Sequence, residues 1–153
     1  MTFDELKLCM AIQRANLKGK DRTSERDRHS AANLVFMHWL RLFKDSRFPW
    51  TIDEVSRHVM NCRKSTSNKL KAEVALAHGS ECYFKNRGKG PCCGDAELGH
   101  IVPRSENGPD VVSNCQIECH AHNSQRGCGS KVMTIEEYLA SDLTTEASCQ
   151  SKP

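Results

Sequence analysis

The feature that most constrains this chain is its cysteine pattern. Six of the nine cysteines fall within 47 of the 153 residues, at positions 82, 92, 93, 115, 119 and 128, with histidines between them. The odd number of cysteines, and an N-terminus without a basic leader and apolar segment, argue against a secreted disulfide scaffold. In a reducing cytoplasm, clustered Cys and His are typical of a zinc site; the simpler interpretation is buried thiols that pack as small apolar side chains. The pattern favours zinc.

Composition and charge limit the classes of function. Apolar residues make up 38% and charged residues 27%, and no run of 18 apolar residues exists that would predict a membrane span. We therefore expect a cytoplasmic, globular protein. The charge is uneven, because residues 1–79 carry 15 Lys and Arg against 9 Asp and Glu, whereas residues 80–153 carry 7 against 10. A basic first half favours an anionic partner, and nucleic acid is the commonest one.

The first half has the apolar spacing of consecutive helices. Four helices are expected, beginning near residues 2, 24, 51 and 66 and ending near residues 18, 47, 60 and 78. Thr51 and Glu54 match a capping box, Ser24 is a predicted N-cap, and Gly79 follows the last helix as a C′ glycine. A polar turn is predicted over residues 61–65.

The pattern changes at Gly79, because eight of the nine glycines lie there or later and the apolar stretches become short. This half is expected to hold loops, a β-hairpin, a short helix capped by Thr134, and a frayed tail over residues 141–153. The predicted fold class is α+β. It has an α-helical domain over residues 1–79 and a second, zinc-stabilised domain over residues 80–153.

The segment from Leu98 to Gly127 carries most of the chemical information. It reads LGHIVPRSENGPDVVSNCQIECHAHNSQRG. Residues 98–102 are expected to form a strand that ends at Pro103, residues 106–110 a turn, and residues 114–119 a second strand that a polar helix follows. This arrangement would bring His100, Asn114 and the Cys/His cluster together.

This segment resembles the HNH nucleases of the ββα-metal (His-Me finger) superfamily. Their motif runs Asp-His-x-x-Pro, a glycine turn, Asn-Leu-x-x-x-Cys-x-x-Cys, then His or Asn, then Lys. The resemblance covers about 45 residues, from 82 to 127. It implies a ββα-metal domain in which His100 is the general base, Asn114 holds the loop around it, and Asn123 binds a catalytic Mg²⁺ or Mn²⁺ ion.

One departure from the motif concerns the catalytic ion. Gly99 stands where the family usually has a metal-binding Asp, which leaves Asn123 as the only ligand of the motif. Glu97 or Asp95 could supply a carboxylate, and Glu97 is preferred because it lies two residues before Gly99 on a strand and so faces the same side. The resemblance also predicts that Gly99→Asp would raise the affinity for the ion.

The second departure concerns the structural zinc that the resemblance implies. Zinc takes four tetrahedral N or S ligands. The expected set is Cys82, Cys93, Cys119 and His122, with Cys92 as the substitute. Cys115 is expected in the core, Cys128 and His120 are reserve ligands, and Cys9, Cys62 and Cys149 are expected only to pack or to be exposed.

Residues 51–70 look like a helix-turn-helix. Its second helix would present Lys64, Ser67, Asn68 and Lys71 to DNA, and Arg104 and Arg126 of the second domain would add phosphate contacts. An ordinary helical hairpin with a solvated basic face explains the same pattern equally well.

The function predicted first is a metal-dependent DNA endonuclease of phage, mobile-element or restriction type. Its partner would be double-stranded DNA, no membrane is implied, and a homodimer stays open. The second interpretation, motivated by Gly99, is a non-catalytic zinc-containing DNA-binding protein on a decayed HNH scaffold. An RNA-cleaving enzyme is a weaker third, since nine aromatic residues give little material for stacking bases.

Overall fold

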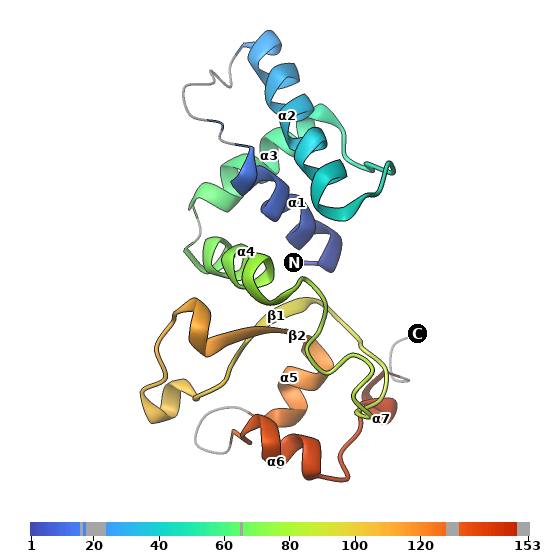
Figure 1. The fold of residues 1–153 in the computed structure, drawn as a ribbon, viewed down its shortest axis with the longest axis vertical. Helices are drawn as coiled ribbons and strands as arrows, with labels where there is room; N and C mark the ends of the chain where they lie inside the picture. The colour runs from blue at the N-terminus through green and yellow to red at the C-terminus, as the bar shows by residue number, and fades with distance from the viewer. Residues whose placement is uncertain (16, 18–23, 65, 128–131, 150–153) are drawn as a thin grey trace. The chain divides into compact units, whose positions relative to one another are not determined.

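The computed structural model describes residues 1–15, 17, 24–64, 66–127 and 132–149, with the side chains of 60–66, 147 and 148 left out. The chain forms two compact units: Asp4–Ala72, and Met1–Phe3 together with Glu73–Pro153. The division falls between Ala72 and Glu73, a few residues before the predicted boundary at 79 and 80. Helices plus one small sheet confirm the α+β class (Figure 1).

The helices of the first half are α1 (Phe3–Arg14), α2 (Glu25–Phe43), α3 (Ile52–Lys64) and α4 (Thr66–His78). The capping box at α3 is confirmed: the Thr51 N–H donates to Glu54 Oε2 at 2.7 Å, and the Glu54 N–H donates to Thr51 Oγ1 at 3.3 Å. Ser24 is the N-cap residue of α2, as predicted, although its side chain makes no cap bond. The predicted turn over residues 61–65 was wrong for residues 61–64, because α3 continues to Lys64.

In the unit Asp4–Ala72, α2 and α3 pack against each other through apolar side chains, and α1 buries Leu6, Leu8 and Ile12. Val35 and Trp39 of α2 are buried, as are Val55 and Val59 of α3. This is the spacing that two amphipathic helices need to bury one face each. At the edge of this contact, Arg28 of α2 donates to Asp53 of α3 at 3.2 Å.

The second unit contains a two-stranded antiparallel sheet of β1 (Ala96–His100) and β2 (Cys115–Cys119). The register pairs Ala96 with Cys119 and His100 with Cys115. Helix α5 (His120–Arg126) follows β2 without a loop and packs against both strands (Figure 1). β1 begins and ends two residues earlier than predicted, because residues 101–102 turn into the loop that leads to the 3₁₀ turn at Arg104–Glu106.

The core of this unit consists of Cys82, Phe84, Cys119, Ala121, Ile135 and Tyr138. Helix α6 (Ile135–Ala140) begins with the predicted capping box, in which Thr134 and Glu137 exchange bonds. The last helix, α7, covers Glu146–Cys149. The prediction of a frayed tail was wrong for the described residues up to 149, because buried Lys89 donates to the carbonyl oxygens of Ser141 and Leu143.

None of the described helices combines the length and the apolar character that crossing a membrane requires.

Candidate metal centre and the loop of His100

Four side chains of metal-binding type meet in the second unit: Cys82, Cys92, Cys119 and His122. Their Sγ and Nδ1 atoms all lie within 4.8 Å of one another. The three sulfur atoms lie 3.4, 3.9 and 3.0 Å from the same nitrogen, Nδ1 of His122. Only Cys92 is exposed, so the cluster is open on one side and enclosed by the core on the others.

The backbone holds the sulfur atoms before any ion binds. The N–H of Cys119 donates to Sγ of Cys82 at 3.2 Å, and the N–H of Tyr83 donates to the carbonyl of Ile117 at 2.7 Å. The N–H of Ala121 donates to the carbonyl of Cys93 at 3.1 Å. These bonds attach the loop around residue 82 to β2 and the loop around residue 93 to α5, so both upstream loops are placed against the end of β2.

The imidazole of His122 is oriented by its second nitrogen. Nε2 lies 3.1 Å from the carbonyl oxygen of Lys89, which can only accept a hydrogen bond, so Nε2 carries the proton. The lone pair on Nδ1 is then directed at the three sulfur atoms. An outer hydrogen bond of this kind fixes the tautomer and the ring orientation of metal-binding histidines. Lys89 is itself 4% exposed, which makes the contact rigid.

The thiols have different acidities. A hydrogen bond from Cys82 lowers the pKa of Cys119 to about 5, and the same bond, with burial, raises the pKa of Cys82. Burial raises the pKa of Cys92, and the charge of Cys119 adds to the rise. One thiolate therefore forms readily, and further negative charge in the cluster requires a cation.

Three thiols and one imidazole are the ligands that zinc prefers. With bonds of about 2.3 Å to sulfur and 2.0–2.1 Å to nitrogen, a tetrahedral ion places its ligand atoms about 3.5–3.8 Å apart. The observed sulfur–nitrogen distances of 3.0–3.9 Å are close to this spacing. The cluster could therefore hold a metal ion with little movement of the chain.

The cluster contains Cys92 where the sequence predicted Cys93, and this is a correction. Cys93 forms a disulfide with Cys149 of α7 and is not a free thiol. The two adjacent sulfur atoms have different partners, since that of Cys92 lies 3.9 Å from Nδ1 of His122 and that of Cys93 is bonded to Cys149. The prediction that Cys149 only packs or is exposed was also wrong, as it was for Cys9, which is disulfide-bonded. Cys115 is fully buried and free, while Cys128 and the side chain of Cys62 lie outside the described residues.

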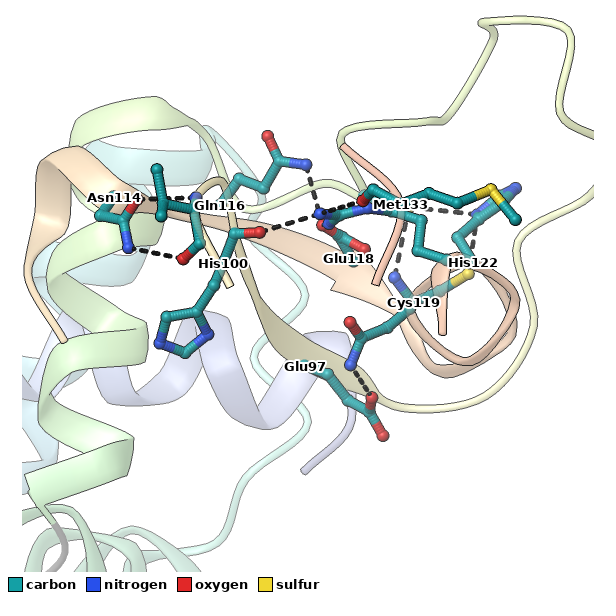
Figure 2. Close-up of polar contacts among 12 residues, drawn as sticks. Glu97, His100, Asn114, Gln116, Glu118, Cys119, His122 and Met133 are labelled. Atoms are coloured by element: carbon teal, nitrogen blue, oxygen red, sulfur yellow. Dashed lines mark hydrogen bonds and ion pairs between the residues drawn. The ribbon is translucent and has the colours of Figure 1, made fainter. Parts of the chain in front are cut away.

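His100 is the last residue of β1 (Figure 2), and its ring is held by a carboxylate. Nε2 of His100 lies 2.7 Å from Oδ1 of Asp110, and Arg104 donates to both oxygens of the same carboxylate at 2.9 and 2.8 Å. The bonds from His100 and Arg104 lower the pKa of Asp110, so this group is ionised at neutral pH. An ionised carboxylate is an acceptor only, so Nε2 is the donor, and in the neutral ring the lone pair is on Nδ1.

Asn114 closes the loop between the two strands. Its Nδ2 donates to the carbonyl oxygen of Pro109 at 3.0 Å. The same amide donates to the Val102 carbonyl at 3.1 Å and accepts from the Val102 N–H at 2.9 Å through Oδ1 (Figure 2). The side chain is buried at the base of the loop. One amide thus fixes both ends of the segment that carries Arg104 and Asp110.

The prediction that Arg126 contacts the phosphates of DNA was wrong, because this side chain is not available to DNA. The side chain is 1% exposed and donates to Glu118 Oε1, to the carbonyl of His100 at 2.8 Å and to that of Met133 at 3.3 Å. Burial raises the pKa of Glu118, which has no exposed surface. The guanidinium thus connects α5 to the end of β1. Arg104 is exposed, but it is paired with Asp110.

The space beside Gly99 is filled by Glu118. A Cβ atom at position 99 would lie 1.8 Å from Glu118 Oε1 and 2.2 Å from its Cδ. The expectation that Gly99→Asp would simply restore a ligand is therefore wrong, because that side chain has no room.

The remaining predicted residues lie as follows. Asn123 of α5 donates to Oε2 of Glu97 at 2.6 Å, and Nδ1 of His120 lies 2.7 Å from Oε1 of Glu97. Asp95, the other carboxylate considered, is paired with the amino group of Met1. In α4, Ser67 is exposed and Asn68 and Lys71 are partly exposed. The side chain of Lys64 lies outside the described residues.

Two residues of this region were missed by sequence reasoning. Asp110 lies in the predicted turn, and the signal that could have identified it is a carboxylate in the loop that follows His100. Glu118 had a weaker signal: it lies two residues after Gln116 on β2, and so shares a face of the sheet with Gln116 and with Gly99, the partner of Gln116 in β1.

Comparison of the chain with family models, with curated proteins and with solved structures finds no match in any of the three.

Proposed function

We propose that this protein is a metal-dependent DNA endonuclease in which His100 is the general base. The observation that carries the proposal is the bond from Nε2 of His100 to Asp110 at 2.7 Å, within a loop that Asn114 closes. This bond leaves Nδ1 as the basic atom of a ring whose side chain is 14% exposed, enough for a water molecule to reach it.

The chemistry follows from these residue types. Hydrolysis of a phosphodiester requires a water molecule that loses a proton as it attacks phosphorus. Nδ1 of His100 would accept that proton, and the ionised Asp110 would stabilise the imidazolium that results, as a buried carboxylate does in a Ser-His-Asp triad. Asn114 acts on geometry alone, since an amide does not accept a proton at neutral pH.

Two metals have separate roles in this proposal. Zinc at Cys82, Cys92, Cys119 and His122 would be structural, because four protein ligands leave no position for substrate. A Mg²⁺ or Mn²⁺ ion held by Asn123 would neutralise charge on the phosphate and on the leaving oxygen when bound. Asn123 and His100 both belong to the assembly of β1, β2 and α5, so the two functions would share one rigid support.

DNA binding is proposed for the basic first half. Residues 1–79 carry a net charge of +6, which favours an anionic partner, and α3 and α4 would act as the two helices of a helix-turn-helix. Ser67, Asn68 and Lys71 would contact phosphates and base edges, together with Lys64.

Cleavage of supercoiled plasmid in Mg²⁺ or Mn²⁺ tests the function. His100→Ala should reduce the rate about 10²–10⁴-fold while zinc content and DNA affinity stay unchanged, because a general base contributes little to ground-state binding. His29→Ala is the matched control, since His29 is an exposed histidine of α2. Equal cleavage by wild type and His100→Ala would contradict the endonuclease.

The second candidate function is a non-catalytic zinc-containing DNA-binding protein. It is favoured by one observation, the replacement of a carboxylate at position 99 by glycine with Glu118 packed into the space. DNA binding without cleavage in any of several divalent ions would support this candidate.

A further inference from the structure

The chain between Thr145 and Cys149 is attached to the loop that leads into Cys92 of the metal cluster (Figure 1). The Thr145 N–H donates to the carbonyl oxygen of Lys89 at 3.0 Å. The Thr145 hydroxyl donates to the same oxygen at 3.2 Å and also to that of Pro91. Thr145 has no exposed surface, so these bonds are shielded from water. They hold residues 89–91 against the start of α7.

The carbonyl oxygen of Lys89 is shared between this segment and the metal cluster. It accepts the Thr145 N–H and also lies 3.1 Å from Nε2 of His122. The second contact orients the imidazole toward the three sulfur atoms, and the loss of an outer hydrogen bond of this kind typically weakens metal binding about 10–100-fold. A displacement of Lys89 would therefore lower the affinity of the cluster for zinc. Whatever holds Thr145 in place also holds this ligand.

A disulfide bond closes the attachment between α7 and the cluster. Cys149, the last residue of α7, is bonded to Cys93, which directly follows Cys92. The Cys149 N–H donates to the Thr145 carbonyl at 3.0 Å, so the two ends of α7 are joined. A helix of four residues is not stable by itself, and the position of α7 therefore depends on the disulfide and on the bonds of Thr145. Both cysteines are partly exposed, so a soluble reductant can reach their sulfur atoms.

We propose that the disulfide between Cys93 and Cys149 is a redox switch for the zinc affinity of the neighbouring Cys/His cluster. Its reductant would be a dithiol: two electrons and two protons pass to the disulfide, the S–S bond breaks, both cysteines become thiols, and the dithiol leaves as a disulfide of its own. With the bond broken, α7 holds Thr145 less firmly against Lys89, and the ring of His122 loses its fixed orientation. Because the coupling is reciprocal, bound zinc favours the disulfide in return. Such a switch operates without DNA or cleavage, and so goes beyond the proposed function.

The dissociation constant of zinc, measured in the full chain by competition with a chromophoric chelator, tests the switch without a cleavage assay. We expect it to rise about tenfold or more after reduction by a phosphine, which leaves as its oxide with the oxygen of a water molecule and adds no thiol that could bind zinc. Cys149→Ser should have the affinity of the reduced wild type and should not respond to the phosphine. Cys9→Ala is the matched control and should keep the response, because Cys9 is disulfide-bonded but belongs to the unit Asp4–Ala72.

Alkylation of Cys93 and Cys149, followed by mass spectrometry, establishes that reduction is complete. Equal zinc affinity before and after complete reduction would overturn the switch. Tighter binding after reduction would overturn it too, since Cys93 would then have joined the ligands. A response to the phosphine that persists in Cys149→Ser would place the responding bond elsewhere and so refute the assignment. Amide hydrogen exchange of β1 and β2 completes the test: a sheet that unfolds on reduction would make the disulfide a structural bond and not a switch.

Discussion

Substitution of Gly99 by alanine should destabilise the second unit through a single collision. The new Cβ would lie 1.8 Å from Glu118 Oε1, 2.2 Å from Cδ and 2.8 Å from Cγ. Because Glu118 is enclosed on all sides, the carboxylate must move away from Arg126. Breaking a buried ion pair costs about 3–5 kcal/mol, and forcing an extra carbon into a packed site costs about 1–3 kcal/mol. We expect a loss of about 3 kcal/mol or more.

The assay must report on the second unit alone. Trp39 and Trp50 both belong to the unit Asp4–Ala72, so their fluorescence monitors the other part of the chain. Amide hydrogen exchange of β1 and β2 monitors the sheet itself and should become faster. Gly79→Ala is the control, since a Cβ there meets nothing within 4 Å and only the positive φ of 102° is strained. It should cost about 1 kcal/mol.

A double-mutant cycle decides whether Glu118 is the cause. In a Glu118→Ala background the collision disappears, so Gly99→Ala should then cost less than about 1 kcal/mol, although Glu118→Ala is itself destabilising. Additive effects of the two substitutions, with a coupling free energy near zero, would refute this explanation.

The other predictions concern the metal cluster, the buried arginine and DNA. Cys92→Ser should lower zinc affinity by orders of magnitude, whereas Cys93→Ser should retain one zinc per chain in elemental analysis; the reverse result would restore the original ligand set. Because the pKa values of Cys82 and Cys92 are raised, zinc displaces their protons, so its affinity should rise with pH between about 6 and 8, with about two protons released in calorimetry in two buffers. Arg126→Met should destabilise the second unit by about 3–5 kcal/mol in denaturant titrations, and Arg126→Lys by less, because it keeps the charge. The logarithm of DNA affinity should fall with the logarithm of salt concentration with a slope of about −4 to −5, for about five neutralised phosphates; a slope near zero would exclude a phosphate-dominated interface.

Local signals determined much of this protein. The starts of α2, α3 and α6 follow from the residues at their N-cap positions, next to the backbone N–H groups of the first turn. The capping boxes at Thr51 and Thr134 are present as predicted. The end of α4 at His78 follows from Gly79 in the left-handed region. The presence of a Cys/His cluster was predictable as well, because thiols interleaved with histidines are typical of a zinc site, and Cys119 and His122 have the spacing of such ligands.

Which residues meet was decided by the tertiary structure. Cys92 and Cys93 are adjacent and chemically equal. Only the path of their loop, which the Ala121 N–H binds to α5, turns the first toward His122 and the second toward Cys149.

The same holds for the charged residues around the sheet. Arg126 has the sequence signature of a phosphate contact, yet it is buried against Glu118, and the direction of a side chain depends on which face of α5 the strands cover. Gly99 looked like a missing ligand, but it is the space that Glu118 occupies from the neighbouring strand. Sequence spacing fixes periodicity along one element, whereas contact between elements depends on register and packing, which no single segment encodes.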